Sequence, residues 1–595
     1  MNEKVLKNLE ALRAEMRKYK ITAVIVPGTD PHQSEYISDH WKVRDWVTGF
    51  TGSNGTAVIT LDDARLWTDS RYFLQAGIEL EGTGITMMKE DGGNDPTIEQ
   101  WLAENLSEGD LLAVDGSLFS VPAANRLENI CGQIGARFAA DFAPFDKIYA
   151  DRPELPLDPI FVHEESYAGE STQSKISRLL DALAENGANA TLLSALDEVA
   201  WLFNIRCNDV MFNPVATAYA YVSKRQRVLF IDERKVDDVA AKYLADHAIT
   251  VAPYKSVNDF LTKVKDDVVL LDPHSTSDTT ARCLYNAETI FRQSPVALMK
   301  ACKNDTQIEG TRRAMERDGV ALVKLYMWLE QNVPAGKVNE VDVAEKVIEF
   351  RGESPLYRGE SFAMAAGYRG NGAIVHYEAE PATAATVGVD GLLLVDTGAQ
   401  YLDGTTDITR TVCFGTPTEE ERHDYTLVLK GHLALGHVTF PEGTRGSQLD
   451  ALARQFLWKE AKTYWHGTGH GVGHFLNVHE GPQNIRLNEN PTTISPGMII
   501  SNEPGLYITD KYGIRIENLV LATSYKETAD FGNFLRFETL TLFPYDTKLI
   551  DVDMLTDEEV RQVNDYHAMV RSRLIPLLND EQATWLNEKT QPITK

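Results

Sequence analysis

Cysteine, basic charge and long apolar runs are all scarce in this 595-residue sequence. The five cysteines are scattered and form no CxxC pair, which indicates free thiols and a reducing compartment. Lys and Arg number 58 against 87 Asp and Glu, so the basic surface that nucleic acid or an anionic membrane requires is not expected. No run approaches the ~18 apolar residues of a membrane span, and the charged N-terminus lacks the apolar core of a signal peptide. We therefore expect a cytoplasmic protein that binds neither nucleic acid nor a membrane.

The order of predicted elements repeats in the first half of the chain. An apolar strand at 21–26 is followed by a hairpin at 56–69, and a strand at 190–196 is followed by a hairpin at 218–232. An amphipathic helix precedes each strand, at 5–19 and at 176–183. This repetition predicts two related α/β domains.

Proline positions and chain length divide the sequence further. A chain of this length exceeds what one hydrophobic core supports. Pro153, Pro156 and Pro159 break the pattern after the first repeat, and a second break falls near 294–304, before a long predicted helix at 308–331. We expect domains at 1–158, 159–300 and 301–595. The last should close with a helix that begins at the capping box Thr556–Glu559.

Four of the chain's 14 histidines lie in one stretch, WHGTGHGVGHFLNVHEGP, which spans residues 465–482. Each interleaved glycine would cost a helix roughly 1 kcal/mol, so the stretch predicts a tight, extended backbone. Histidine is the commonest metal ligand among side chains. Taken alone, the stretch fits a glycine-rich turn with surface histidines equally well.

Two aspartates flank a predicted hairpin. The apolar strand 392–395 leads directly to Asp396, and the chain returns through Asp407 in TTDITRT. Simple pairing about a turn centred between Tyr401 and Leu402 would set Asp396 across from Asp407, with Cβ atoms about 5 Å apart. An Asx-rich surface hairpin is the alternative, but the apolar residues before Asp396 favour a buried position.

Two glutamates repeat this arrangement. Glu503 ends the segment GMIISNE, and Glu517 begins the return in GIRIEN, so the two are symmetric about Asp510. Alternation along the strand puts Arg515 on the same face as Glu517. Because facing carboxylates repel unless a cation lies between them, the two hairpins together predict a metal site of four carboxylates and at least one imidazole.

That ligand set indicates a reaction class. Four negative charges suit two divalent ions that share bridging oxygens. Oxygen ligands favour Mn²⁺ or Mg²⁺, and the presence of one histidine ligand means that Zn²⁺ and Co²⁺ remain alternatives. Two ions about 3.5–4 Å apart can deprotonate a bridging water and stabilise a developing oxyanion. The prediction is metal-assisted hydrolysis, most naturally of an amide.

Four motifs in order carry a family resemblance: VDTGAQYLDGTTDITRT, WHGTGHGVGHFLNVHEGP, SNEPGLY and GIRIENL. Together they resemble the pita-bread metallopeptidases, in particular the long, three-domain Xaa-Pro aminopeptidases (aminopeptidase P). LWTDSRYFLQA, ALDEVAWLFNIR and FLRFETLTLFPYD also fit, so the resemblance spans nearly the whole chain. It implies an α/β (α+β) fold with two creatinase-like N-terminal domains and a pita-bread catalytic domain. It further implies two divalent ions per subunit (Mn²⁺ first, Zn²⁺ or Co²⁺ as alternatives), a homodimer, and release of the N-terminal residue from peptides with proline second.

The motifs carry the family's site residues onto this sequence. The implied metal ligands are Asp396, Asp407, His470, Glu503 and Glu517, with Asp407 and Glu517 touching both ions or lying between them. No ligand position departs from the family pattern.

Other residues are implied to surround the substrate. His376 in GAIVHY and His479 in NVHEGP would bind the substrate, beside His470, and stabilise the tetrahedral intermediate. His466 would line the same pocket, and Arg515 and Tyr507 would support the carboxylates and the scissile region. His474 is the weakest candidate.

Arg71, in TDSRY, has two interpretations. Its position favours a surface arginine paired with Asp69, whereas the resemblance implies an arginine that reaches from the first domain toward the bound peptide.

Three other functions remain open. A prolidase would cut only Xaa-Pro dipeptides, and a methionine aminopeptidase would share the ligands without needing some 300 residues before them. A peptide-binding scaffold of the same fold would have no activity.

Overall fold

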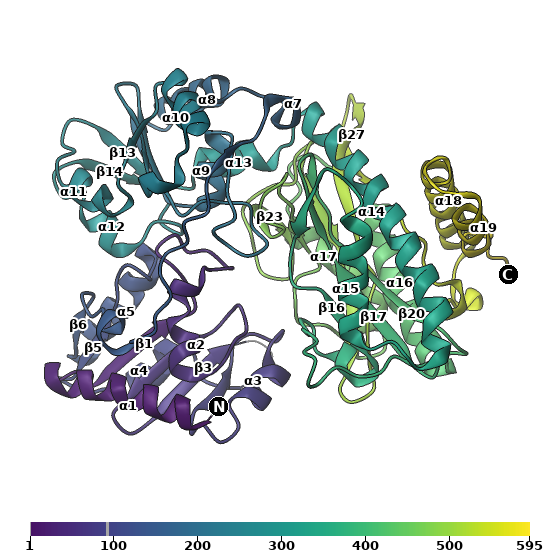
Figure 1. The fold of residues 1–595 in the computed structure, drawn as a ribbon, viewed down its shortest axis with the longest axis horizontal. Helices are drawn as coiled ribbons and strands as arrows, with labels where there is room; N and C mark the ends of the chain where they lie inside the picture. The colour runs from purple at the N-terminus through teal and green to yellow at the C-terminus, as the bar shows by residue number, and fades with distance from the viewer. Residues whose placement is uncertain (1, 91–93) are drawn as a thin grey trace. The chain divides into compact units, whose positions relative to one another are not determined.

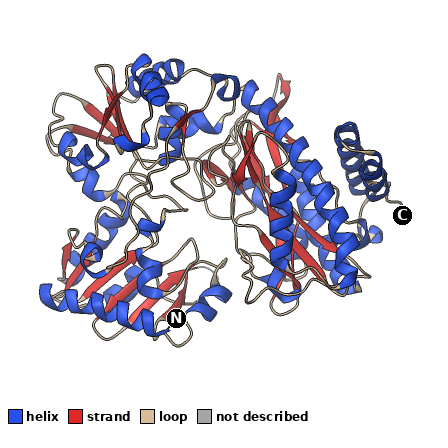
Figure 2. Ribbon diagram, viewed as in Figure 1, coloured by secondary structure: helices blue, strands red, loops and turns tan. Residues whose placement is uncertain are grey.

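The computed structural model describes residues 2–90 and 94–595 (Figures 1 and 2). These residues form two compact units. The first unit contains the chain up to residue 165 together with 170–297, and the second contains 166–169 and 298–595. Among the described residues, no helix is long and apolar enough to cross a membrane.

The first unit contains two six-stranded sheets of the same topology. Their strand orders are β4-β3-β2-β1-β5-β6 and β12-β11-β10-β8-β13-β14. In each sheet the two central hairpin pairings are antiparallel and the three remaining pairings are parallel. The internal repeat predicted from element order is therefore confirmed. The strands are β1 (Ala23–Pro27), β2 (Thr56–Thr60), β3 (Ala64–Thr68), β4 (Thr86–Lys89), β5 (Leu111–Val114), β6 (Arg137–Ala139), β8 (Ala190–Leu193), β10 (Tyr219–Ser223), β11 (Arg227–Phe230), β12 (Thr250–Ala252), β13 (Val268–Leu271) and β14 (Glu288–Phe291), with a small pair β7 (Phe161–Val162) and β9 (Ile205–Arg206).

Helices accompany these sheets, and the two predicted from apolar periodicity are present. The first, α1 (Asn2–Tyr19), buries Val5, Leu9, Leu12 and Met16, whereas Tyr19 at its end is 54% exposed. The others are α2 (Val43–Thr48), α3 (Phe73–Glu79), α4 (Ile98–Asn105), α5 (Val121–Ile134), α6 (Phe145–Ile148), the second predicted helix α8 (Thr172–Glu185), α9 (Leu196–Leu202), α10 (Asp238–Asp246), α11 (Val257–Leu261) and α12 (Asp278–Arg282). Two further helices, α7 (Glu165–Ala168) and α13 (Pro295–Ala301), contain residues of both units.

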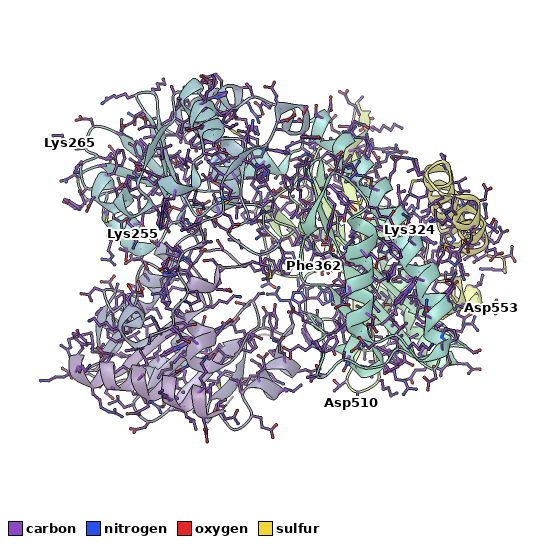
Figure 3. All side chains as sticks on the ribbon, in the orientation of Figure 1. Lys255, Lys265, Lys324, Phe362, Asp510 and Asp553 are labelled. Carbon is purple, nitrogen blue, oxygen red and sulfur yellow. The ribbon has the colours of Figure 1, made fainter. Side chains whose placement is uncertain are left out.

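The second unit contains long helices and several sheets of short, mostly antiparallel strands. The long predicted helix is α14 (Asp305–Asn332), which begins at a capping box formed by Asn304 and Gln307. Lys324, labelled in Figure 3, lies on it. The remaining helices are α15 (Glu340–Arg351), α16 (Glu419–Gly436), α17 (Gly446–Trp458), α18 (Asp557–Leu574) and α19 (Asp580–Lys589).

The strands of the second unit form two main sheets, β16-β17-β20 and β21-β28-β27-β24-β22-β23. Smaller sheets β15-β18-β19 and β25-β26 extend the hairpins that carry the acidic residues. The strands are β15 (Tyr357–Glu360), β16 (Ala365–Tyr368), β17 (Leu392–Thr397), β18 (Ala399–Tyr401), β19 (Gly404–Thr405), β20 (Ile408–Cys413), β21 (Thr439–Pro441), β22 (Gly469–Gly471), β23 (Glu480–Ile485), β24 (Ile499–Asn502), β25 (Gly505–Ile508), β26 (Tyr512–Arg515), β27 (Asn518–Thr528) and β28 (Gly532–Thr539).

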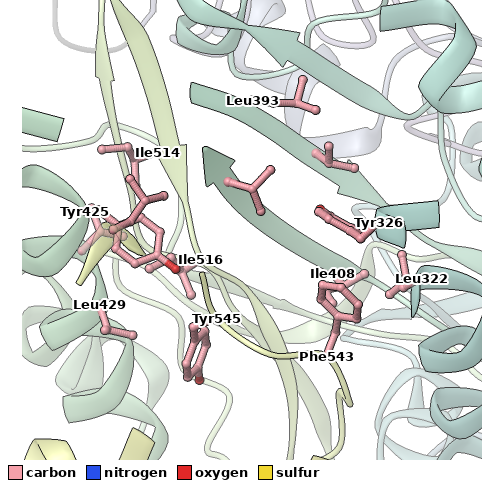
Figure 4. Packing of buried hydrophobic residues seen from close by; sticks show 14 of the residues in the cluster. Leu322, Tyr326, Leu393, Ile408, Tyr425, Leu429, Ile514, Ile516, Phe543 and Tyr545 are labelled. Carbon is pink, nitrogen blue, oxygen red and sulfur yellow. The ribbon is translucent and has the colours of Figure 1, made fainter. Parts of the chain in front are cut away.

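A continuous hydrophobic core joins these strands to the helices (Figure 4). Tyr326 on α14 packs with Phe543 at a ring-centroid distance of 4.6 Å, and Ile408 at the start of β20 is buried in the same cluster. Ile514 and Ile516, which flank Arg515, are fully buried there too. At roughly 1.5–3 kcal/mol for each large apolar side chain buried, this core holds the strands that carry the acidic residues firmly in place.

The C-terminal region contains one helix that the sequence pattern did not reveal. The predicted helix α18 begins at the capping box of Thr556 and Glu559 and gives way to a 3₁₀ turn that contains Pro576. Helix α19 follows, although only Leu586 among its residues is fully buried. Because its apolar side is so narrow, it lacks the periodicity by which helices are recognised.

Candidate metal centre

The histidine-rich stretch is extended, as its glycines predict. His470 lies at the centre of β22, which pairs with β23 on one side and β24 on the other. A Cβ atom on Gly469 would collide with the Ser501 carbonyl, and one on Gly471 with the Glu480 carbonyl. Glycine is therefore required on both sides of His470, because only a backbone without side chains approaches these neighbours so closely.

The aspartate hairpin forms with a register two residues from the predicted one. Asp396 on β17 pairs with Thr409 on β20, so it does not lie directly across from Asp407. The prediction was wrong because the turn is centred one residue later, where β18 and β19 pair as Gln400 with Thr405. Asp407 precedes β20 by one residue. It is two residues from Thr409, so the alternation of side chains keeps it near Asp396.

The glutamate hairpin has the predicted register. Asn502 pairs with Asn518, and Gly505 pairs with Arg515, so both pairings are symmetric about Asp510. Glu503 and Glu517 lie between these pairs and therefore face each other. Asp510, labelled in Figure 3, forms the turn with a φ of 63°.

The two hairpins and β22 bring the predicted ligands together. Asp407, His470 and Glu517 each offer one ligand atom, and these atoms lie within 4.8 Å of one another. His470 Nε2 is 3.4 Å from Asp407 Oδ2 and 3.3 Å from Glu503 Oε1. The Nδ1 of His470 lies 2.9 Å from the Gly471 carbonyl, which fixes the proton on Nδ1 and turns the Nε2 lone pair toward the carboxylates.

Burial and mutual repulsion shape the electrostatics of this cluster. The pKa values of Asp407 and Glu517 are raised well above their usual range, first by burial and then by the neighbouring carboxylates. Asp396 Oδ1 is buried without a hydrogen-bond partner. A cation would bind this unpaired oxygen and would offset the repulsion among the carboxylates. The donor set of four carboxylates and one imidazole fits two divalent ions.

One row of side chains extends from Asp396. Arg515 donates to Asp396 Oδ2 at 2.6 Å and to the Tyr507 hydroxyl at 2.7 Å. The hydroxyl lies 2.8 Å from His466 Nε2, and His466 Nδ1 lies 2.8 Å from the Gly467 carbonyl. Tyr507 therefore accepts from Arg515 and donates to His466. Burial raises the pKa of Tyr507 to about 12, so the hydroxyl keeps its proton.

A second row extends from His470. The His479 ring lies 4.4 Å from the His470 ring, and the His376 ring stacks at 6.5 Å from that of His479. All the residues of the second unit for which the sequence predicts a site role thus lie in one cluster. His474, the weakest candidate, is buried instead with Nε2 directed at the Tyr167 carbonyl, 3.2 Å away.

Two hydroxyls that the sequence analysis did not predict form hydrogen bonds with the predicted ligands. Thr409 donates to Glu517 Oε2 at 2.7 Å and accepts from Arg515, and Ser501 donates to Glu503 Oε1 at 3.1 Å. Both lie two residues from a predicted ligand, so strand alternation could have indicated them.

Arg71 belongs to the first unit, just after β3. Its guanidinium donates to Asp69 at 2.8 Å and to Glu35 at 3.1 Å. The pairing with Asp69 is the one that its sequence position favours.

Comparison with known proteins identifies the family. The model for metallopeptidase family M24 matches residues 309–524, and that for the C-terminal region of peptidase M24 matches 533–593. Two creatinase/prolidase N-terminal domain models match 8–149 and 151–307. The chain belongs to metallopeptidase family M24. Its fold is the expected one, with two creatinase-like α/β domains and a pita-bread domain, and it is a hydrolase.

Named relatives match over nearly their whole length. Xaa-Pro aminopeptidase 1 of Dictyostelium discoideum is 38% identical over 99% of this chain and 97% of its own, and aminopeptidase P2 of Arabidopsis thaliana is 39% identical over 97% and 86%. A solved X-prolyl aminopeptidase from Caenorhabditis elegans, described as a cytosolic enzyme with a dinuclear active site, is 33% identical. It covers 99% of this chain and all of its own, with a TM-score of 0.95.

Removal of Glu517, a predicted ligand of both ions, should abolish metal binding without unfolding the chain. We expect Glu517→Ala to lose activity and most of its bound metal, because the remaining carboxylates cannot bridge two ions, yet to keep the circular dichroism spectrum of the parent. Glu420→Ala, which changes an exposed glutamate paired with Lys511, is the control. Near-normal turnover of Glu517→Ala in saturating Mn²⁺ would refute the ligand assignment.

Metal uptake should release protons. Because the pKa values of Asp407 and Glu517 are raised, the folded metal-free protein keeps protons that the unfolded chain loses above pH ~4. The metal-free protein should therefore lose stability as pH rises from ~4 through the raised pKa, and apparent metal affinity should rise over the same range. Calorimetric titrations in buffers of different ionisation enthalpy count the protons. Uptake without proton release would contradict this electrostatic description.

Proposed function

We propose that the chain releases the N-terminal residue from peptides that have proline at the second position. The observation that carries this proposal is the cluster of four carboxylates and His470, in which the buried Asp396 Oδ1 has no hydrogen-bond partner. The relatives named as Xaa-Pro aminopeptidases support the proline preference, because the similarity extends over both N-terminal domains as well as the catalytic one.

The proposal includes two Mn²⁺ ions per subunit held by Asp396, Asp407, His470, Glu503 and Glu517, a homodimer and a cytoplasmic location. It also includes the domain division 1–158, 159–300 and 301–595, which the matched family regions support.

In this proposal the chain's own residues orient the peptide and stabilise charge. When bound, a pair of divalent ions supplies Lewis acidity and lowers the pKa of a water molecule. His479 and His376 donate hydrogen bonds to the scissile carbonyl oxygen as negative charge develops on it, which is where such donors contribute most. Arg515 and Tyr507 keep Asp396 oriented, and His466 lines the same pocket.

A peptide panel tests the proposal. Mass spectrometry in Mn²⁺ buffer should show loss of the first residue from a longer Ala-Pro peptide, little from its Ala-Ala counterpart, and none from an N-acetylated form. Equal cleavage of the Ala-Pro and Ala-Ala peptides would favour a broader aminopeptidase. Cleavage of the Ala-Pro dipeptide alone would favour a prolidase, and no cleavage with metal bound would favour a peptide-binding scaffold.

Arg71 should contribute to peptide binding. A guanidinium suits a peptide carbonyl or C-terminal carboxylate, and such a contact is alike in ground and transition states. We expect Arg71→Ala to raise KM about tenfold or more with little change in kcat, metal content or pH profile. Arg65→Ala is the control, because Arg65 lies on β3, the strand that precedes Arg71, and is also paired with an aspartate, Asp63. Unchanged KM and kcat for both a tripeptide and a longer peptide would show that Arg71 is structural.

A further inference from the structure

A buried arginine lies directly behind the carboxylate cluster. Arg410 is on β20, three residues after Asp407, and is 1% exposed. Its five N–H groups lie within hydrogen-bond distance of six acceptors, and no carboxylate of the described residues is among them. The acceptors are the Pro544 carbonyl at 3.1 Å, the Thr409 carbonyl at 2.9 Å, the Glu517 carbonyl at 2.6 Å, the Asn518 side chain at 2.8 Å, the Phe543 carbonyl at 2.6 Å and the Tyr566 hydroxyl at 2.9 Å.

Two of these bonds hold the backbone of the metal centre itself. Arg410 Nη1 binds the carbonyl of Glu517, whose side chain is a predicted ligand, and the carbonyl of Thr409, whose hydroxyl donates to that same side chain. The Arg410 guanidinium therefore helps to position Glu517 in two ways. It binds the Glu517 main chain directly, and it binds Thr409, whose hydroxyl donates to the Glu517 carboxylate.

The network continues to a third ligand segment. The side chain of Asn518, which accepts a hydrogen bond from Arg410, also contacts His432. The distance from Asn518 Nδ2 to His432 Nε2 is 3.1 Å. His432 Nδ1 lies 3.1 Å from the carbonyl of Asn502, the residue before Glu503, and Asn502 Nδ2 donates to the His432 carbonyl at 2.9 Å. The segments that carry Asp407, Glu503 and Glu517 thus share one buried network.

The outer end of this network lies in the C-terminal helix α18. Tyr566, on α18, is 7% exposed. Its hydroxyl lies 2.9 Å from the Phe543 carbonyl and 3.0 Å from the Thr541 carbonyl. A hydroxyl has one proton, which here is donated to a carbonyl oxygen. The Tyr566 oxygen therefore accepts a hydrogen bond from Arg410.

A buried guanidinium without a counter-ion is stable only when its donors are satisfied. The two hydrogens of Arg410 Nη2 share three acceptors, which lie on Asn518, Phe543 and Tyr566. If the Tyr566 oxygen is removed, the guanidinium re-centres on the two that remain, and the bonds from its Nη1 to Thr409 and Glu517 then shift. A metal site tolerates displacements of about 0.5 Å or less, and loss of a group that orients a ligand typically weakens metal binding 10–100-fold.

We propose that Arg410 and Tyr566 are positioning residues of the metal centre, through which helix α18 sets the spacing of the ligands for the second ion. The inference rests on the proposed two-metal function. It gives the C-terminal region a role in metal binding beyond its packing against the catalytic domain.

Tyr566→Phe is the decisive variant, because it removes one oxygen and keeps the ring. Tyr425→Phe is the matched control, since Tyr425 is fully buried in the same core (Figure 4) and its hydroxyl has no hydrogen bond to Arg410. Trp585→Phe is a second control. It breaks the 2.7 Å bond between α19 and Glu330 of α14 without touching Arg410.

Each metal-free variant is titrated with Mn²⁺ in a calorimeter, and the spin-coupled Mn²⁺ pair is followed by electron paramagnetic resonance. We expect Tyr566→Phe to bind the weaker ion at least tenfold less tightly and to need correspondingly more Mn²⁺ for the coupled signal. Its kcat should return to near the parent value in excess Mn²⁺, with an unchanged peptide KM. Both control variants should match the parent. Arg410→Lys, if it folds, should weaken metal binding further.

Parent-like affinity for both ions in Tyr566→Phe would overturn the proposal, whatever its thermal stability. Equal weakening in Tyr425→Phe would also overturn it, because any buried change would then suffice. If the parent protein binds fewer than two ions, both this inference and the proposed function are wrong. If it binds two ions but cleaves no peptide, only the proposed function is wrong.

Discussion

Repulsion among four clustered carboxylates, two of them buried, is the constraint on which the catalytic unit depends. Burial and neighbouring charge raise the pKa values of Asp407 and Glu517, and the Arg515 guanidinium binds the Asp396 carboxylate. Side chains that repel one another stay together only if the surrounding structure holds them. Strand register, the hydroxyls of Thr409 and Ser501 and the hydrophobic core in Figure 4 supply that hold.

Each predicted ligand is positioned by an ordinary structural feature, and these features come from distant parts of the chain. A three-residue turn centred on Asp510 fixes the glutamate pair, while glycines on both sides of His470 let β22 approach its neighbours. Behind them, Arg410 joins three ligand segments to helix α18. The metal site is therefore a property of the whole catalytic unit, including its C-terminal helix, although its ligands lie in a few short motifs.

How far the sequence predicted this site depends on the kind of constraint. The glutamate register was predictable because a short turn leaves one symmetric solution, and the duplicated N-terminal sheets were predictable from element order. The aspartate register was missed by two residues because β18 and β19 form a further pairing whose turn centre lies one residue later. Arg410, Thr409 and Tyr566 act through contacts between residues far apart in sequence, and threonine, arginine and tyrosine are too common in strands and helices to mark such contacts. Strand register predicted which face of each strand a side chain lies on, but the contacts between distant residues became evident only in the folded structure.

The central claim is that the four clustered carboxylates are arranged for two cations and not for one. Anomalous diffraction at the manganese absorption edge, from crystals of the full chain grown with Mn²⁺, tests it most directly. Two peaks about 3.5–4 Å apart are expected, with Asp407 and Glu517 in contact with both or between them. A single peak bound by His470 and fewer than four carboxylates, or no peak within the cluster, would contradict it.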